Sequence, residues 1–160
     1  MTDFTWMQFN APLFHLNVPS TWIAQATPEI QAMFSEPEAD QTLVSNLMIL
    51  VRVVDDGVSP ASIVDEAQPD LVEEFEGYEL LAREDFENGG IRGATVSFRW
   101  HDSATDLNVL QLQIYFVFEN WLFSLLATTE ESRGEALRPL FYEMIGSFTM
   151  RIPEPAAENQ

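Results

Sequence analysis

The sequence predicts an α+β protein in which helices cover an antiparallel β-sheet. Apolar and polar residues alternate in two short segments near the N-terminus, at 4–9 and 13–18, as they do in half-buried strands. Two longer strand pairs follow, with turn residues at 88–90 and 119–120. Two further segments carry apolar residues at the spacing of amphipathic helices.

Composition limits the classes of partner. The chain has 160 residues, of which 46% are hydrophobic, and its 26 acidic residues outnumber 7 basic ones, all arginine, for a net charge of −19. Such a field repels phosphate backbones and anionic lipid, so we expect neither nucleic acid nor a membrane surface as a partner. Because cysteine is absent, we expect no disulfide, thiol nucleophile or cysteine-ligated metal.

The length favours one domain. We expect residues 1–152 to form it, because no linker interrupts them, and residues 153–160 to be a disordered tail. The N-terminus carries no secretory signal, and the apolar run at 47–54 is too short to cross a bilayer and contains Arg52. We therefore expect a cytoplasmic protein with no membrane insertion.

The first half of the chain predicts mostly strands. In segment 13–18, Phe14, Leu16 and Val18 share one face, and the proline that follows ends the strand. Residues 28–43 predict a short strand and a loop. The nearly continuous apolar run at 46–54 is typical of a central strand.

A helix and a hairpin come next. Ser59 and Pro60 are a capping hydroxyl and a first-turn proline. Pro69 should kink or split the helix. We expect the core-facing residues of this helix to be Ile63, Val64, Leu71, Val72 and Phe75. Strands at 78–86 and 91–101 then flank Asn88-Gly89-Gly90, whose residues tolerate a positive φ.

The last strand pair is rich in aromatic residues. A two-residue turn at Glu119-Asn120 would pair Phe118 with Trp121, Phe116 with Phe123, Ile114 with Leu125 and Leu112 with Ala127. One face of this hairpin is then entirely apolar and must be covered. The cover is a helix that begins with a capping box at Ser132 and Glu135 and that Pro139 shortens or bends. Its apolar face comprises Leu137, Leu140, Phe141, Met144, Ile145 and Phe148.

Taken in order, these features resemble the Mog/PsbP-like fold family, including its DcrB-like bacterial branch. The resemblance rests on FHLNVPSTW, NLMILVRVV, GYELLARED, the hairpin YFVFENWLFSLLATT and the closing MIGSF, and it covers about residues 10–150. It implies an α/β/α sandwich and a non-enzymatic role. Roles in that family include binding the GTPase Ran, assisting photosystem II and, in the related Eag-type proteins, chaperoning secretion effectors.

The residues exclude common catalytic machinery. Without lysine there is no phosphate-binding Walker lysine and no Schiff base, and two histidines cannot form a three-histidine zinc site. His101-Asp102 is the most reactive-looking pair, but neighbours on a strand point to opposite faces. We interpret it as a strand-end histidine followed by a loop aspartate. We expect no catalytic residue, cofactor or metal.

The polar face of the hairpin is the candidate binding surface. We predict that Arg99 and His101 join Gln113, Tyr115 and Ser124 on this face and that together they bind another protein or a peptide segment. The simpler alternatives are that a helix or the N-terminal strands cover this face, or that it is an ordinary solvated face. Two other functions remain open, namely a small-molecule carrier or Asp/Glu-dependent hydrolase with a closed pocket, and a homodimer that buries these faces.

Overall fold

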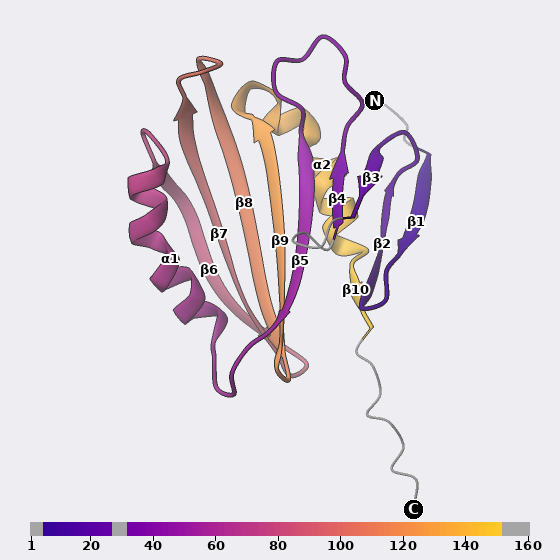
Figure 1. Cartoon of the computed structure of the whole chain (residues 1–160), viewed down its shortest axis with the longest axis vertical. Helices are drawn as coiled ribbons and strands as arrows, with labels where there is room; N and C mark the ends of the chain where they lie inside the picture. The colour runs from indigo at the N-terminus through magenta and orange to yellow at the C-terminus, as the bar shows by residue number, and fades with distance from the viewer. Residues whose placement is uncertain (1–4, 27–31, 152–160) are drawn as a thin grey trace, which may run out of the picture.

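Strands are the predominant regular elements, and they form two antiparallel sheets (Figure 1). The structure is a computed structural model that describes residues 5–26 and 32–151. The large sheet has seven strands in the order β3 (Ile23–Gln25), β4 (Ala32–Ser35), β5 (Asn46–Val53), β9 (Trp121–Glu130), β8 (Leu107–Phe118), β7 (Ile91–Asp102) and β6 (Glu79–Asn88). The small sheet has three strands in the order β1 (Trp6–Asn10), β2 (Phe14–Pro19) and β10 (Thr149–Met150).

Helices lie on both faces of the large sheet. Helix α1 (Pro60–Glu74) packs on β7 and β8. Helix α2 (Gly134–Gly146) follows a 3₁₀ turn, η1 (Glu131–Arg133), and contacts β2 and β9 on the opposite face, beside the small sheet (Figure 1). The predicted α+β architecture, an antiparallel sheet with helices packed on it, is therefore confirmed. The short edge strand β3 and the separate small sheet are additions to the prediction.

The aromatic hairpin has the predicted register. Phe118 pairs with Trp121, and the pairing continues to Leu112 opposite Ala127. Glu119 takes a positive φ of 53° to close the turn, although glutamate is unusual there. The apolar face that results contributes to the main core.

The main core lies between the small sheet, α2 and the β4, β5 and β9 strands. Phe14, Leu16 and Val18 of β2 are at most 1% exposed, as their alternation predicts. Phe123 of β9 is fully buried, and its ring lies 5.4 Å from that of Phe116. Burial of such side chains is the main stabilising contribution to the fold.

The two helices differ from the sequence prediction in detail. Ser59 caps α1 by accepting a hydrogen bond from the Ser62 amide, as predicted, but α1 continues through Pro69 and leaves Val72 exposed. Packing on the sheet offsets the hydrogen bond that an interior proline removes. Likewise, α2 continues through Pro139.

The predicted capping box of α2 is wrong. Arg133 is the N-cap residue, with no side-chain capping bond, and the Ser132 hydroxyl donates to Glu130 instead. Instead of a side-chain cap, the 3₁₀ turn provides a partner for the first backbone N–H of the helix, because the Gly134 amide donates to the Glu131 carbonyl.

Residues 153–160, predicted to be a tail, lie outside the described residues. Among the residues that the structure describes, no helix is long and apolar enough to cross a membrane.

Candidate functional site

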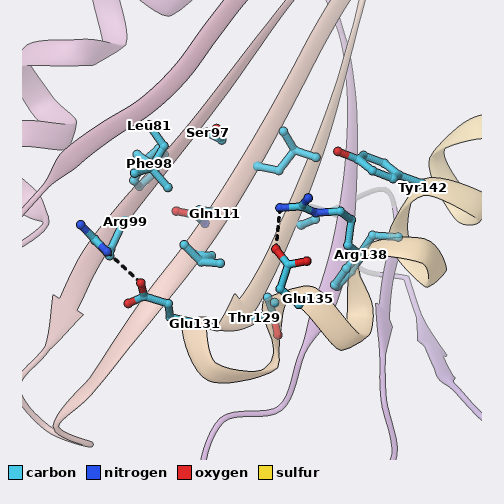
Figure 2. A pocket seen from close by; sticks show the side chains of 15 residues that line it. Leu81, Ser97, Phe98, Arg99, Gln111, Thr129, Glu131, Glu135, Arg138 and Tyr142 are labelled. Atoms are coloured by element: carbon cyan, nitrogen blue, oxygen red, sulfur yellow. Dashed lines mark hydrogen bonds and ion pairs between the residues drawn. The ribbon is translucent and has the colours of Figure 1, made fainter.

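A groove of about 530 Å³ opens between α2 and the β6, β7 and β8 strands (Figure 2). We call it the α2 groove. Its floor is apolar, because Leu110 and Leu112 of β8 and Ala127 of β9 contribute to it. Two large side chains at its rim are exposed to solvent: Leu81 of β6 (47%) and Tyr142 of α2 (59%). The site is therefore an open groove with an apolar base.

The groove exists because α2 covers only part of the sheet. The buried face of α2 is directed to the main core, so Arg138 and Tyr142 lie at the groove. At the start of α2, Gly134 lies so close to β8 that an added Cβ would be 2.7 Å from Leu110 Cδ1. This close approach, which a glycine allows, brings the start of α2 against β8 at the wall of the groove.

Two ion pairs lie on opposite sides of the groove (Figure 2). Arg99 Nη1 of β7 donates to Glu131 Oε1 at 2.8 Å, and Arg99 also contacts Glu79. Across the groove, Arg138 Nη2 lies 3.1 Å from Glu135 Oε1. Hydrogen bonds to Glu79 and Glu131 raise the pKa of the Arg99 guanidinium above its usual value. The rim therefore presents charged groups of both signs around an apolar floor.

The structure separates the predicted site residues into two groups. Arg99 and His101 lie on the α2 face of the sheet, because Arg99 pairs with Leu110 and His101 with Asn108. Gln113 pairs with Val96, on the face toward α1. The expectation that all five residues share one face is therefore wrong. Of the five, only Arg99 has its side chain at the groove rim (Figure 2).

Gln113, Tyr115 and Ser124 lie on the sheet face toward α1, where Tyr115 is half-buried. Gln113 and Ser124 are each 7% exposed, and the Tyr115 hydroxyl donates to Gln113 Oε1 at 2.8 Å. Tyr115 also packs against Val64 of α1 and Ala94 of β7. Burial raises the pKa of the Tyr115 hydroxyl to about 12. At Tyr115 a helix, α1, therefore covers the sheet face, as one of the simpler alternatives predicts. The binding role of these three residues remains a prediction.

His101 lies at the end of β7 and is not paired with Asp102. Its Nε2 is 3.2 Å from Asp106 Oδ1 and its Nδ1 is 3.1 Å from Asn108 Oδ1. Asp102 instead accepts hydrogen bonds from the Ala104 amide and the Thr105 hydroxyl. Among residues 5–26 and 32–151, no group of three or more His, Asp or Glu side chains is placed to hold a metal ion.

Four rim residues of the groove were absent from the sequence prediction. Leu81 occupies a β-bulge between Leu80 and Ala82, which no residue pattern indicates. Arg138 and Tyr142 do carry a signal, because they lie between the apolar positions of α2, which places them away from the core. Glu131 belongs to the 3₁₀ turn before α2, which the sequence analysis did not predict.

The fold is a layered α+β arrangement, and solved structures identify it. The chain is similar to cyanobacterial PsbP (CyanoP) from Synechocystis sp. PCC 6803, with a TM-score of 0.69, 16% identity and coverage of 94% of this chain and 95% of that one. It is also similar to LpqN of Mycobacterium tuberculosis, involved in cell envelope biogenesis, with a TM-score of 0.69, 13% identity and coverage of 94% of this chain and 93% of that one. A third similar structure is the Saccharomyces cerevisiae Ran-binding protein Mog1p, with a TM-score of 0.64, 12% identity and coverage of 92% of this chain and 96% of that one. The chain therefore has the Mog/PsbP-like fold.

These similarities concern the fold. No protein-family model matches the sequence, and no curated protein matches it. With identities of 12–16%, the shared backbone does not transfer function, which has to be argued from the site.

Proposed function

We propose that this chain is a non-enzymatic accessory protein that binds a segment of another protein in the α2 groove. The observation that carries this proposal is the exposure of Leu81 and Tyr142 above an apolar floor. Protein interfaces concentrate their binding energy in a few aromatic, arginine and apolar anchors. The groove offers such anchors as Tyr142, Arg99 and Arg138 at its rim.

The similar structures support this reading at a coarse level. The yeast protein that shares the fold is a Ran-binding protein, so at least one chain of this shape acts through another protein. A chaperone-like role, the DcrB-like branch and a cytoplasmic location are the finer parts of the proposal. They rest on the sequence pattern and on the resemblance stated above.

A small-molecule carrier is the second candidate, because the volume of the groove is suitable. Small-molecule sites typically measure about 300–1,000 Å³, and this groove measures about 530 Å³. However, a carrier or hydrolase predicts a closed pocket, whereas Arg138 and Glu135 at this rim have side chains 57% and 86% exposed. Both carboxylates, Glu131 and Glu135, contact arginines, an arrangement that suits electrostatic recognition.

A charge-reversal pair tests the proposal. We expect Arg138→Glu to weaken the binding of the copurifying partner at least about tenfold, because it places a second carboxylate beside Glu135 at the rim. Arg92→Glu changes the net charge equally at an exposed position outside the groove and should leave binding unchanged. The measurement is the affinity of the purified protein for the purified partner.

The proposal is wrong if the two variants weaken binding equally or if neither changes it. Light scattering on the free protein separates the homodimer, since a dimer through the groove would dissociate in Arg138→Glu and not in Arg92→Glu.

A further inference from the structure

The outer edge of the large sheet is a second exposed feature. Strand β6 is the last of the seven strands, and within the described residues it pairs only with β7. From Glu79 to Glu87, every residue except Arg83 is exposed. The strand has ten residues, whereas β3 at the opposite edge has three. Folds commonly shorten or cover their edge strands to prevent pairing with other chains, whereas β6 is long and most of its described side chains are exposed.

The turn at the end of β6 determines which backbone groups face outward. Asn88 pairs with Ile91 across a two-residue turn, at Gly89 and Gly90 with φ of 59° and 84°. In such a hairpin the flanking pair exchanges both of its hydrogen bonds, and the pattern alternates along the strand. Over the regular stretch from Ala82 to Asn88, the odd-numbered residues therefore direct their N–H and C=O groups away from β7. Three such residues are Arg83, Asp85 and Glu87.

These outward groups have no partner in the described part of the chain. No backbone hydrogen bond joins Arg83, Asp85 or Glu87 to an element beyond β7. The register with β7 is regular from Ala82 to Asn88, after the bulge at Leu81. The free edge is therefore about as long as the strand segments that bind by β-strand addition, which need alternate backbone groups over a few residues.

The charge of this edge selects its partner. Four of the β6 side chains are acidic, namely Glu79, Glu84, Asp85 and Glu87. The single cation, Arg83, contacts Asp65 of α1, and its Nε lies 3.9 Å from Asp85 Oδ1. The edge is thus negative on a chain whose net charge is −19. Like charges opposite one another destabilise paired strands, and opposite charges stabilise them.

We propose that β6 binds an extended, basic segment of a partner protein as an added strand paired with residues 82–88. On the groove side the segment would meet Ala82, Glu84 and Phe86, so apolar and basic residues fit there. On the other side it would meet Asp85 and Glu87, where basic residues fit. A second copy of this chain is disfavoured, because self-pairing of β6 would bring its acidic residues together. The proposal does not depend on the α2 groove.

Asp85 offers the most direct test. The probe is a fluorescein-labelled ten-residue peptide of alternating lysine and valine, and the matched control peptide has glutamate in place of lysine. We expect the lysine peptide to bind and the glutamate peptide not to bind. Asp85→Pro removes an outward N–H without removing a bond to β7. It should weaken binding at least about tenfold relative to Asp85→Asn, which makes the same change in charge but keeps the N–H.

Two further measurements keep the outcome clear. Thermal unfolding must show that Asp85→Pro is folded; if it is not, lysine peptides N-methylated at every second residue replace it. Methylation on one backbone edge should abolish binding, and methylation on the other edge should not, because an added strand uses one edge only. Binding that is equal in Asp85→Pro and Asp85→Asn, or equal for both methylated peptides, overturns the proposal. So does sedimentation of the free protein as a dimer that Asp85→Pro dissociates.

Discussion

The two halves of the sheet face toward α2 differ in burial: one half is covered and the other is open to solvent. In the sealed half, formed by β4, β5 and β9, Ile49, Phe123 and Leu125 are at most 1% exposed beneath α2 and the small sheet. In the open half, formed by β6, β7 and β8, Leu81 and the rim of the α2 groove are in contact with solvent. The same antiparallel sheet thus supplies the core on one side and the candidate site on the other.

The difference shows that the position of α2 determines which residues are free to bind. The apolar face of α2 is directed to β9 and β2, and its exposed face borders the groove. Helix α1 has a similar effect on the other face, where it covers Tyr115. Variants in the two halves should therefore separate stability from binding.

The largest expected effect is in the sealed half. Phe123→Ala removes a fully buried ring that stacks on Phe116 and lies 5.9 Å from the Phe148 ring. We expect a loss of about 3–5 kcal/mol in the free energy of unfolding, measured with urea. Leu81→Ala, in the open half, should change it by less than about 1 kcal/mol. Equal losses would show that the open half is packed as tightly as the sealed half.

The next effect concerns an ion pair at the border of the sealed half. Glu36, 7% exposed, accepts hydrogen bonds from Arg133 Nη2 at 2.7 Å and from the Ser45 amide at 2.8 Å. Burial alone would raise the pKa of Glu36, but the bonds from Arg133 and Ser45 outweigh it and hold the pKa below its usual value. Glu36→Gln should cost about 2 kcal/mol of unfolding free energy at pH 7.

This loss should depend on pH. Because the folded-state pKa of Glu36 lies below the unfolded value of 4.5, the stabilisation is present above that value and is lost as the pH falls through the folded-state value. The wild type and Glu36→Gln should therefore converge in stability as the pH falls through the folded-state pKa of Glu36, which lies below 4.5. Glu66→Gln, at an exposed position of α1, is the control. A gap between wild type and Glu36→Gln that persists in acid would contradict the role of the carboxylate charge.

A smaller effect is expected beneath α1. Tyr115→Phe removes the hydroxyl that donates to Gln113 and should cost about 1 kcal/mol at pH 7. Since burial raises the pKa of Tyr115 to about 12 from 10, wild-type stability should be full below pH 10 and fall as the pH rises toward 12. In Tyr115→Phe this part of the alkaline loss should disappear. Tyr142→Phe, at the exposed groove rim, should change neither quantity.

The smallest effect on stability is expected at the groove. Arg138 and Glu135 form an exposed pair, and such pairs contribute little. Arg138→Glu should change the unfolding free energy by less than about 1 kcal/mol, while it weakens partner binding. A loss of stability as large as that of Glu36→Gln would mean that the groove rim is part of the packed structure.

The sequence predicts the strands and hairpins well where a short turn determines the register. The two-residue turn at Glu119-Asn120 leaves one pairing for the whole aromatic hairpin, and that pairing is observed. Between β7 and β8, Asp102 pairs with Leu107 across four residues, so odd-numbered residues of β7 face even-numbered residues of β8. A register change of one residue exchanges the faces of a strand. For this reason Arg99 and His101 were assigned to the wrong face.

The candidate site was less predictable than the fold. The groove depends on how far α2 extends over the sheet, which is set by packing between segments distant in sequence. The close approach of Gly134 to Leu110 and the bulge at Leu81 are tertiary features without a local pattern. The burial of Gln113 and Ser124 corresponds to the alternative that a helix covers this face, which the sequence left open beside a binding surface.

Photo-crosslinking from two matched helix positions tests the central claim most directly. Tyr142 at the groove and Val72 on α1 are both 59% exposed, and either can be replaced by benzoylphenylalanine without disturbing the core. The partner should crosslink from position 142 and not from position 72, and Arg138→Glu should abolish the crosslink while Arg92→Glu preserves it. A partner that crosslinks equally from both positions, or only from position 72, would contradict binding in the α2 groove.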